Sequence, residues 1–377
     1  MGERGRTGTC ELRRDDDPPP FVRIYKTRTE TSQLLRCFGD CTGRGAACVL
    51  GHTPREHHMN APVAGRPSPV PANTRSRREP LMDFLRPASW EEALAAKAEH
   101  PTAVPIAGGT DVMVEINFDH RRPEYLLDLN RIGELSEWEV GQENVRLGAS
   151  VPYSAIMEHL RAELPGLALA SHTVASPQIR NRGGVGGNLG TASPAGDAHP
   201  ALLAADCEVE AESVRGKRLI PIDAFYTGVK RNALEPDELI RAVHIKKADG
   251  PQQYSKVGTR NAMVIAVCAF GIALHPETRT VRTGIGSAAP TPIRAREAEE
   301  FLNAALEEGG FWENGKIITP SIAQQFATLA SGACNPIDDV RGTAKYRRHA
   351  VGIMARRTLG WTWEQYRGAG RALEGAA

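Results

Sequence analysis

The sequence predicts an α+β protein with more than one domain. The chain has 377 residues, enough for two or three domains of about 100–200 residues each. Strand and helix patterns alternate just after residue 82, hairpin patterns dominate the middle of the chain, and helical patterns gather at its end. Hydrophobic residues make up 41% and charged residues 24% of the chain, which allows a large core.

The first ordered unit is expected at 82–135, as a small parallel βαβ subdomain. Ser89 is a favourable N-cap, and Glu92 completes a capping box for a helix that runs to about Glu99. The next elements are expected to be a strand, a glycine turn, a helix and a strand, at 104–106, 108–109, 111–116 and 125–128.

Residues 136–248 predict an antiparallel α+β subdomain. The patterns at 137–140 and 145–147 flank a Gly-Gln-Glu-Asn turn, which is a hairpin signal. A second alternating pattern turns at 215–217. The other elements expected here are a helix and three strands, at 152–160, 207–214, 218–221 and 239–245.

A third unit, a smaller α+β domain, is expected at 252–360. Its strands are predicted at 264–274 and 280–285, around a turn at 275–277. Helices are predicted at about 294–307, 320–331 and 341–358, and 361–377 is interpreted as a tail.

Residues 1–81 differ in composition from the rest. They hold 14 Lys and Arg against 9 Asp and Glu, are rich in Pro, Gly, Arg and Thr, and lack a sustained helical or strand period. We interpret them as a disordered extension, or as the result of a misassigned start before Met82. Cys37, Cys41 and Cys48 have neither the spacing nor the fourth ligand of a zinc or iron–sulfur site, so no metal site is predicted.

Several classes of function are not favoured. The net charge is +1, so no nucleic-acid partner is expected. The apolar run at 262–274 has 13 residues, whereas a membrane span needs about 20. No apolar signal segment precedes Asp15, and a cytoplasmic location is expected. Cys207 and Cys268 lie in apolar runs and are interpreted as buried thiols.

Two glycine loops carry the functional signal. The loop at 105–111 leaves a predicted strand and enters a predicted helix, so several backbone N–H groups can converge on one anion. The loop at 181–188 has four glycines in five positions, which indicates a backbone that needs freedom or close approach. Neither loop matches the dinucleotide or phosphate-loop fingerprints, and either alone could be a mobile turn. Together they predict a diphosphate held between two loops.

At these residues the sequence resembles the flavoprotein subunit of molybdenum hydroxylases. The resemblance covers about 82–360 and is greatest to the separate FAD subunit of bacterial xanthine dehydrogenases, with the carbon monoxide dehydrogenase medium subunit a near neighbour. The matching stretches occur in the family's order, at 107–111, 176–181, 186–188, 191–197, 256–260 and 288–294.

The resemblance implies a two-subdomain FAD-binding domain of the vanillyl-alcohol-oxidase type at 82–248, followed by the C-terminal flavoprotein domain. It places Asp197 at the adenosine end of FAD, Leu234 near the adenine, and Val174 beside the flavin. Lys256 is implied near the flavin ring, as the catalytic candidate. The cofactor-binding residues implied are Pro105, Ile106, Ala107, Gly108, Gly109, Thr110, Asp111, Val112, Val174, Gly184, Val185, Gly186, Gly187, Asn188, Asp197, Leu234 and Lys256.

Simpler interpretations stay open at some of these positions. Asp197 could cap a helix at 198–205, and Lys256 could be a solvated strand end. A hydrolase triad around His199 is not favoured, because no nucleophile elbow is present. Relatives commonly have Ser or Thr where Gly184 stands, so we expect Gly184→Thr not to weaken FAD retention.

The resemblance also implies a role in a complex. A large molybdopterin subunit would oxidise the substrate, and a small subunit with [2Fe–2S] clusters would pass electrons to FAD in this chain. FAD would deliver them to NAD or another acceptor, within a dimer of heterotrimers. The alternatives are the medium subunit of a carbon monoxide, aldehyde, nicotinate or hydroxybenzoyl-CoA oxidoreductase, a free-standing flavin reductase, and an assembly subunit that has lost its flavin.

Overall fold

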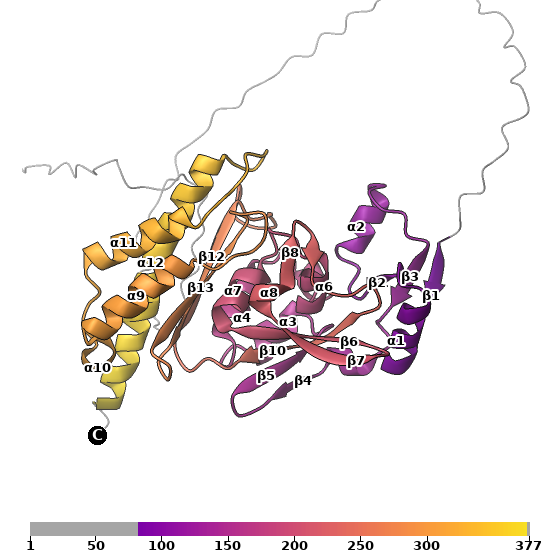
Figure 1. The fold of residues 1–377 in the computed structure, drawn as a ribbon, viewed down its shortest axis with the longest axis horizontal. Helices are drawn as coiled ribbons and strands as arrows, with labels where there is room; N and C mark the ends of the chain where they lie inside the picture. Colours follow the sequence, from indigo (N-terminus) through magenta and orange to yellow (C-terminus); the bar gives the residue numbers. More distant parts are fainter. Residues whose placement is uncertain (1–81, 375–377) are drawn as a thin grey trace, which may run out of the picture. The chain divides into compact units, whose positions relative to one another are not determined.

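A computed structural model describes residues 82–374, and it confirms the α+β class. The first part is a three-stranded parallel sheet in the order β1-β3-β2 (Figure 1). Ser89 caps the first helix as predicted, because its Oγ accepts from the N–H of Glu92 at 3.2 Å. The elements are β1 (Asp83–Leu85), α1 (Trp90–Glu99), β2 (Val104–Ile106), α2 (Val112–Asn117) and β3 (Tyr125–Asp128).

The second part is a five-stranded antiparallel sheet in the order β4-β5-β10-β6-β7. Its strands are β4 (Trp138–Val140), β5 (Asn144–Gly148), β6 (Cys207–Ser213), β7 (Gly216–Pro221) and β10 (Leu239–Lys246). The other elements here are η1 (Gly133–Ser136), α3 (Tyr153–His159), α4 (Pro165–Thr173), α5 (Pro177–Arg180), α6 (Val185–Thr191), α7 (Ala198–Ala205), α8 (Ile222–Phe225), β8 (Tyr226–Gly228) and β9 (Arg231–Asn232).

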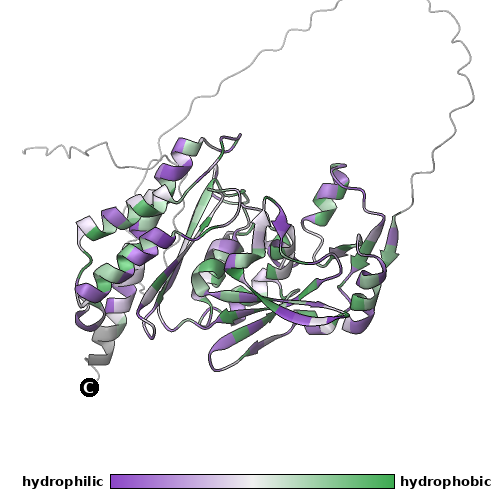
Figure 2. Ribbon diagram, viewed as in Figure 1, coloured by the Kyte–Doolittle hydropathy of each residue, from purple (hydrophilic) through white to green (hydrophobic). Residues whose placement is uncertain are grey.

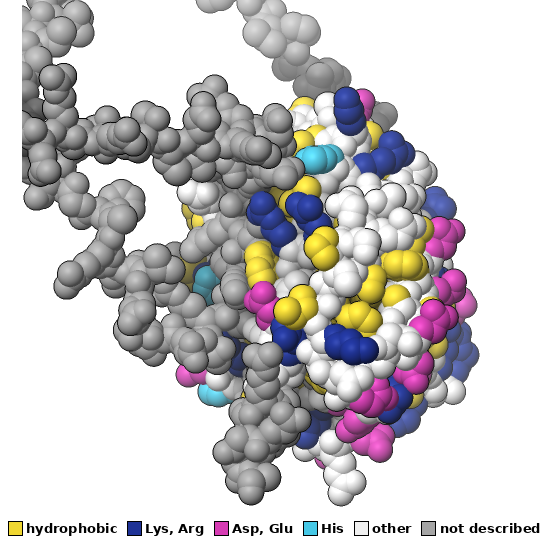
Figure 3. All heavy atoms as spheres, turned by 90° about the vertical axis from the view of Figure 1, so that its left-hand side faces the viewer, with side chains coloured by type: hydrophobic (Ala, Val, Ile, Leu, Met, Phe, Trp, Pro, Cys, Tyr) yellow, Lys and Arg dark blue, Asp and Glu magenta, His cyan; other side chains and the backbone are white. Residues whose placement is uncertain are grey.

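The C-terminal part is an antiparallel sheet in the order β11-β12-β13, with helices on one face. On the side that Figure 3 shows, apolar side chains lie in small groups between basic and acidic ones, as on an ordinary exposed surface. The elements are β11 (Gln252–Val257), β12 (Cys268–His275), β13 (Thr280–Gly286), α9 (Arg296–Glu308), α10 (Phe311–Asn314), α11 (Pro320–Gly332) and α12 (Ala344–Glu374).

Helix α7, from the second part, packs against the C-terminal sheet. It is apolar along most of its length (Figure 2), and every one of its residues is buried. The sheet approaches it closely at Gly284, where an added Cβ would lie only 2.1 Å from the carbonyl oxygen of Pro200. A larger residue at that position would push α7 off the sheet, so glycine is required by packing.

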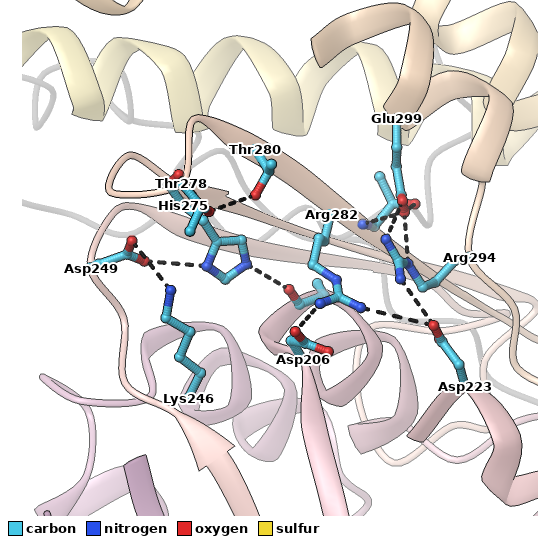
Figure 4. Close-up of polar contacts among 12 residues, drawn as sticks. Asp206, Asp223, Lys246, Asp249, His275, Thr278, Thr280, Arg282, Arg294 and Glu299 are labelled. Carbon is cyan, nitrogen blue, oxygen red and sulfur yellow. Dashed lines mark hydrogen bonds and ion pairs between the residues drawn. The ribbon is translucent and has the colours of Figure 1, made fainter. Parts of the chain in front are cut away.

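Polar side chains secure the same junction (Figure 4). Arg282 of β13 pairs with Asp206, and Arg294 Nη1 lies 3.0 Å from Asp223 Oδ2. His275, which is buried, lies with Nε2 3.1 Å from the carbonyl oxygen of Ala204. The C-terminal sheet is therefore fixed to the second part by charge pairs as well as by apolar packing.

Two predicted elements differ from the structure. The strand expected from residue 264 begins at Cys268, because 258–266 forms a loop in which Arg260 bonds the carbonyl of Met263. The last helix was expected to end near 358, with a tail from 361, but α12 continues to Glu374. The reason is packing: Trp363 is buried against Trp312, with ring centroids 5.4 Å apart.

The structure also bears on the predicted buried thiols and on a possible membrane span. Cys207 and Cys268 are free buried thiols, as predicted. No helix within 82–374 is long and apolar enough to cross a bilayer. Residues 1–81, with Cys37, Cys41 and Cys48 and the expected extension, and residues 375–377, the last three of the expected tail, lie outside the described part.

Candidate cofactor site

The two glycine loops lie against each other. The first loop joins β2 to α2, and the second joins α5 to α6. An added Cβ on Gly108 would lie 1.9 Å from the carbonyl oxygen of Arg182, and one on Gly183 would lie 3.2 Å from Thr110 Oγ1. Only glycine permits so close a backbone approach, which explains the glycine at position 108.

Side chains that the sequence analysis did not single out brace the two loops. Asn130 Nδ2 donates to the carbonyl of Ala107 at 2.8 Å, and Asn130 Oδ1 accepts from Arg182 at 3.2 Å. Thr191 Oγ1 donates to Asp111 Oδ2 at 2.5 Å. Asn130 lies two residues after the end of β3, and that position near a strand end was the signal that could have revealed it.

The first loop offers a row of free backbone donors. Among the described residues, none of the five N–H groups of 108–112 has a hydrogen-bond partner. Gly109 has φ 70°, a left-handed conformation that turns the loop. In the second loop, the N–H groups of Gly184 and Gly187 also lack a partner in the described part, and a Cβ on Gly187 would meet open space. Unpaired N–H groups on two adjoining loops suit an anion with many acceptors.

Asp197 and Lys256 form a buried ion pair. Lys256 Nζ lies 2.7 Å from Asp197 Oδ2 and donates to the carbonyl of Thr173 at 3.2 Å, while the Tyr254 hydroxyl donates to Asp197 Oδ1 at 3.4 Å. Burial raises the pKa of Asp197 to about 6, although Lys256 acts in the opposite direction. Asp197 occupies the N-cap position of α7, but its side chain makes no capping bond.

This pairing corrects one expectation. The resemblance placed Asp197 at the adenosine end of the cofactor and Lys256 at the flavin ring. Two residues whose side chains touch cannot lie at opposite ends of an extended dinucleotide, so the two placements cannot both hold. Lys256 is buried rather than solvated at a strand end.

A pocket of about 280 Å³ lies beside Lys256. One wall comes from 172–180, and the other from the end of β11 and the loop that follows it. Val174 lies between two lining residues and packs on the core. The lining includes Thr173, Ala175, Arg180, Lys256, Arg260 and Met263. Helix α5 leads from this pocket to the second glycine loop, so the pocket wall and that loop are neighbours along the chain.

Two other residues considered in the sequence analysis, Leu234 and His199, do not line the pocket. Leu234 follows β9, and its N–H donates to Asn232 Oδ1, while Asn232 Nδ2 donates to the carbonyl of Gly190 at the end of α6. His199 is buried beside Tyr226, whose hydroxyl lies 2.8 Å from His199 Nδ1, and burial lowers the His199 pKa to about 3. This histidine is engaged by a tyrosine and not by the serine of a hydrolase triad.

Comparison with known proteins gives the family. Residues 79–247 match the model of the FAD binding domain in molybdopterin dehydrogenase, and residues 253–362 match that of the CO dehydrogenase flavoprotein C-terminal domain. The chain is 34% identical to the nicotinate dehydrogenase FAD-subunit of Eubacterium barkeri, over 59% of this chain and 80% of that protein. It is 30% identical to the carbon monoxide dehydrogenase medium chain of Hydrogenophaga pseudoflava, over 75% and 98%. The chain belongs to the FAD-binding medium subunits of the xanthine dehydrogenase and carbon monoxide dehydrogenase family.

Further relatives agree with this family. The chain is 29% identical to the xanthine dehydrogenase FAD-binding subunit of Escherichia coli O157:H7, over 74% of this chain and 96% of that protein. The solved carbon monoxide dehydrogenase of Hydrogenophaga pseudoflava matches with a TM-score of 0.68 and 28% identity, over 75% of this chain and 98% of that one. The chain is therefore a flavoprotein-family oxidoreductase subunit with the family's two-domain fold.

The described residues fit FAD, and Gly184 is more crowded than its place in a glycine loop indicates. A dinucleotide carries a diphosphate, and the unpaired N–H groups of 108–112 match that group's many acceptors. At Gly184, however, an added Cβ would lie 2.5 Å from the carbonyl oxygen of Val151. A threonine at this position would have to displace the main chain of the loop after β5, whereas the expectation about FAD retention stays a prediction.

Proposed function

We propose that this subunit holds FAD with its diphosphate between the two glycine loops and its flavin ring in the pocket beside Lys256. The observation that carries the proposal is the row of five N–H groups at 108–112, which have no partner among the described residues and lie against the second, glycine-rich loop. The proposed diphosphate contacts are Pro105, Ile106, Ala107, Gly108, Gly109, Thr110, Asp111, Val112, Gly184, Val185, Gly186, Gly187 and Asn188. Val174, Asp197 and Lys256 would adjoin the ring, and Leu234 the adenine.

The chain's own residues bind and orient the cofactor. FAD, when bound, would supply the capacity to take up electrons singly and to release them in pairs. Asn130 and Thr191 keep the two loops at a fixed separation through their bonds to Ala107 and Asp111. Tyr254 and Asp197 hold the Lys256 ammonium in place. A preformed cradle of this kind loses little entropy when the cofactor binds.

In the proposed complex, this subunit carries out the last electron transfer, from FAD to an external acceptor. A large molybdopterin subunit would oxidise the substrate, and a small subunit with [2Fe–2S] clusters would pass the electrons to FAD here. FAD would reduce an external acceptor such as NAD, in a cytoplasmic dimer of heterotrimers of the xanthine dehydrogenase type. Support comes from relatives that are themselves named as FAD subunits or medium chains of dehydrogenases.

A second candidate function has the same FAD site in this chain but a different substrate in the partner subunit. The similarity to nicotinate and carbon monoxide dehydrogenase chains is as high as that to the xanthine dehydrogenase subunit. The substrate of such a complex is bound outside this chain, so this candidate differs in the partner and not in the residues described above.

Reoxidation of the complex tests the acceptor. The complex would be expressed from its native genes and purified, and its FAD content would be measured from the absorbance spectrum. Its reduced form would then be mixed anaerobically with NAD or with a quinone, and separately with oxygen. We expect one FAD per chain and fastest reoxidation by NAD. One FAD per chain with no reoxidation by NAD would overturn the acceptor, and a complex without flavin would overturn the cofactor assignment.

A further inference from the structure

The charge of the pocket beside Lys256 comes from more than one basic side chain. Besides His172, the basic residues lining it are Arg180, Lys256 and Arg260, and none of its lining residues is Asp or Glu. A flavin ring that takes up two electrons and one proton gains one negative charge. Which of these cations can stabilise that charge depends on which already has an anionic partner.

Lys256 has such a partner. Its ammonium lies 2.7 Å from the Asp197 carboxylate, and both side chains are at least 90% buried. The pair is close to neutral as seen from a nearby ring, because the fields of the two opposite charges largely cancel. Lys256 can donate a hydrogen bond, but it brings little net positive charge to the pocket.

Arg180 has no carboxylate partner in the described part of the chain. Its Nη1 donates to the carbonyl oxygens of Val174 and Ala175, at 2.8 and 3.1 Å, and its Nε and Nη2 make no bond with described residues. Neutral carbonyls leave the full charge of the guanidinium in place. The side chain is half-buried on α5, so water screens its charge less than at an exposed position.

Arg260 has no carboxylate partner among residues 82–374 either, but its charge is less effective than that of Arg180. It bonds the carbonyl of Met263, and it is an exposed residue in the loop after β11. An exposed charge is screened by water and salt. Arg260 therefore serves as a matched comparison for Arg180 in the same pocket.

We propose that Arg180, and not Lys256, supplies the positive charge that stabilises the reduced flavin ring. This inference rests on the proposed function, since it requires the ring to lie in this pocket. Arg180 also positions the pocket wall, because the two carbonyls that it holds flank the turn where Ala175 has φ 31°, a left-handed conformation. Its charge and its positioning role can be separated by substitution.

The midpoint potential of bound FAD is the measurement. Arg180→Met and Arg180→Gln remove the charge, and Arg180→Lys keeps it while losing the paired carbonyl bonds. We expect the neutral variants to bind reduced FAD about tenfold less well relative to oxidised FAD, a fall of about 30 mV for a two-electron couple. Arg180→Lys should stay near the wild-type potential, and Arg260→Met should shift it less than Arg180→Met.

A second test removes the Lys256–Asp197 pair, which should matter less to the potential than Arg180. The double variant Lys256→Met with Asp197→Asn removes both charges and should shift the potential less than Arg180→Met. Potentials are measured on the full chain with FAD in excess, so a variant with weakened binding is still tested. Equal shifts in Arg180→Lys and Arg180→Met, or an unchanged potential in Arg180→Met, would overturn the role of its charge. A wild-type chain that takes up no FAD would instead overturn the proposed function.

Discussion

Single glycines in this chain are explained by the atoms that face them. Gly108 and Gly184 each face a backbone carbonyl that a Cβ would overlap, whereas Gly187 and Gly190 face open space. The sequence predicted that the glycine-rich loops needed close approach. It did not predict which glycine faces which carbonyl, because Gly108 faces Arg182 and Gly184 faces Val151, and both segments are distant in sequence from the glycine.

Gly184→Thr is expected to destabilise the fold. Its Cβ would lie 2.5 Å from the Val151 carbonyl oxygen, and relieving such overlap typically costs about 1–3 kcal/mol. Urea unfolding of the purified chain measures the change. Gly190→Thr, in the same helix but facing open space, is the control. Equal stability of the two variants would show that the loop moves aside without cost.

Asp197 gives a pH dependence of defined sign. Its pKa is about 6 in the folded chain and near 3.8 as a free side chain, with burial the main cause and Lys256 and Tyr254 acting against it. A carboxyl with a raised folded pKa favours the folded state at low pH, and this contribution is lost as pH rises towards 6. The stability difference between wild type and Asp197→Asn should therefore fall between about pH 4 and 6 and then level off. Unfolding at four pH values in this range measures it, and a flat difference would contradict the burial of this carboxyl.

At the scale of elements, local signals predicted most of the fold. The cap at Ser89, the hairpin turns and the alternating strands all depend on neighbours in sequence, and the structure confirms them. The length of α12 depends on contacts with α10, which sequence spacing does not reveal. The pairing of Asp197 with Lys256 was missed for the same reason, since it joins two domains.

Trp363 should hold the end of α12 in place. It is 2% exposed, and its Nε1 donates to the carbonyl of Lys316 at 2.7 Å. Trp363→Ala is expected to lower the free energy of unfolding by about 3–5 kcal/mol. Trp361→Ala, which removes a half-buried tryptophan two residues earlier, should cost less in the same urea titration. The reverse order would indicate that residues beyond 360 behave as the tail first expected.

At the scale of the whole molecule, the proposed cofactor region is built from several parts of the chain. The loops at 105–112 and 182–188 come from two subdomains, and the pocket wall at 256–264 comes from the C-terminal domain. The sequence predicted the two loops, but it did not predict β11, the buried strand that carries Lys256. The bonds of Thr191 and Tyr254 could not be predicted, because each reaches a segment distant in sequence, and only Asn130 had a signal in its position near a strand end.

The central claim is that FAD is held where Gly108 meets Arg182. Gly108→Ala would place a Cβ 1.9 Å from the Arg182 carbonyl oxygen and force the two loops apart. Fluorescence titration of the apoprotein with FAD measures the affinity, with Gly190→Ala as the control and circular dichroism as a check of folding. We predict that Gly108→Ala folds but binds FAD at least about tenfold more weakly than the control, a difference of about 1.4 kcal/mol. Wild-type affinity in a folded Gly108→Ala chain would contradict the account.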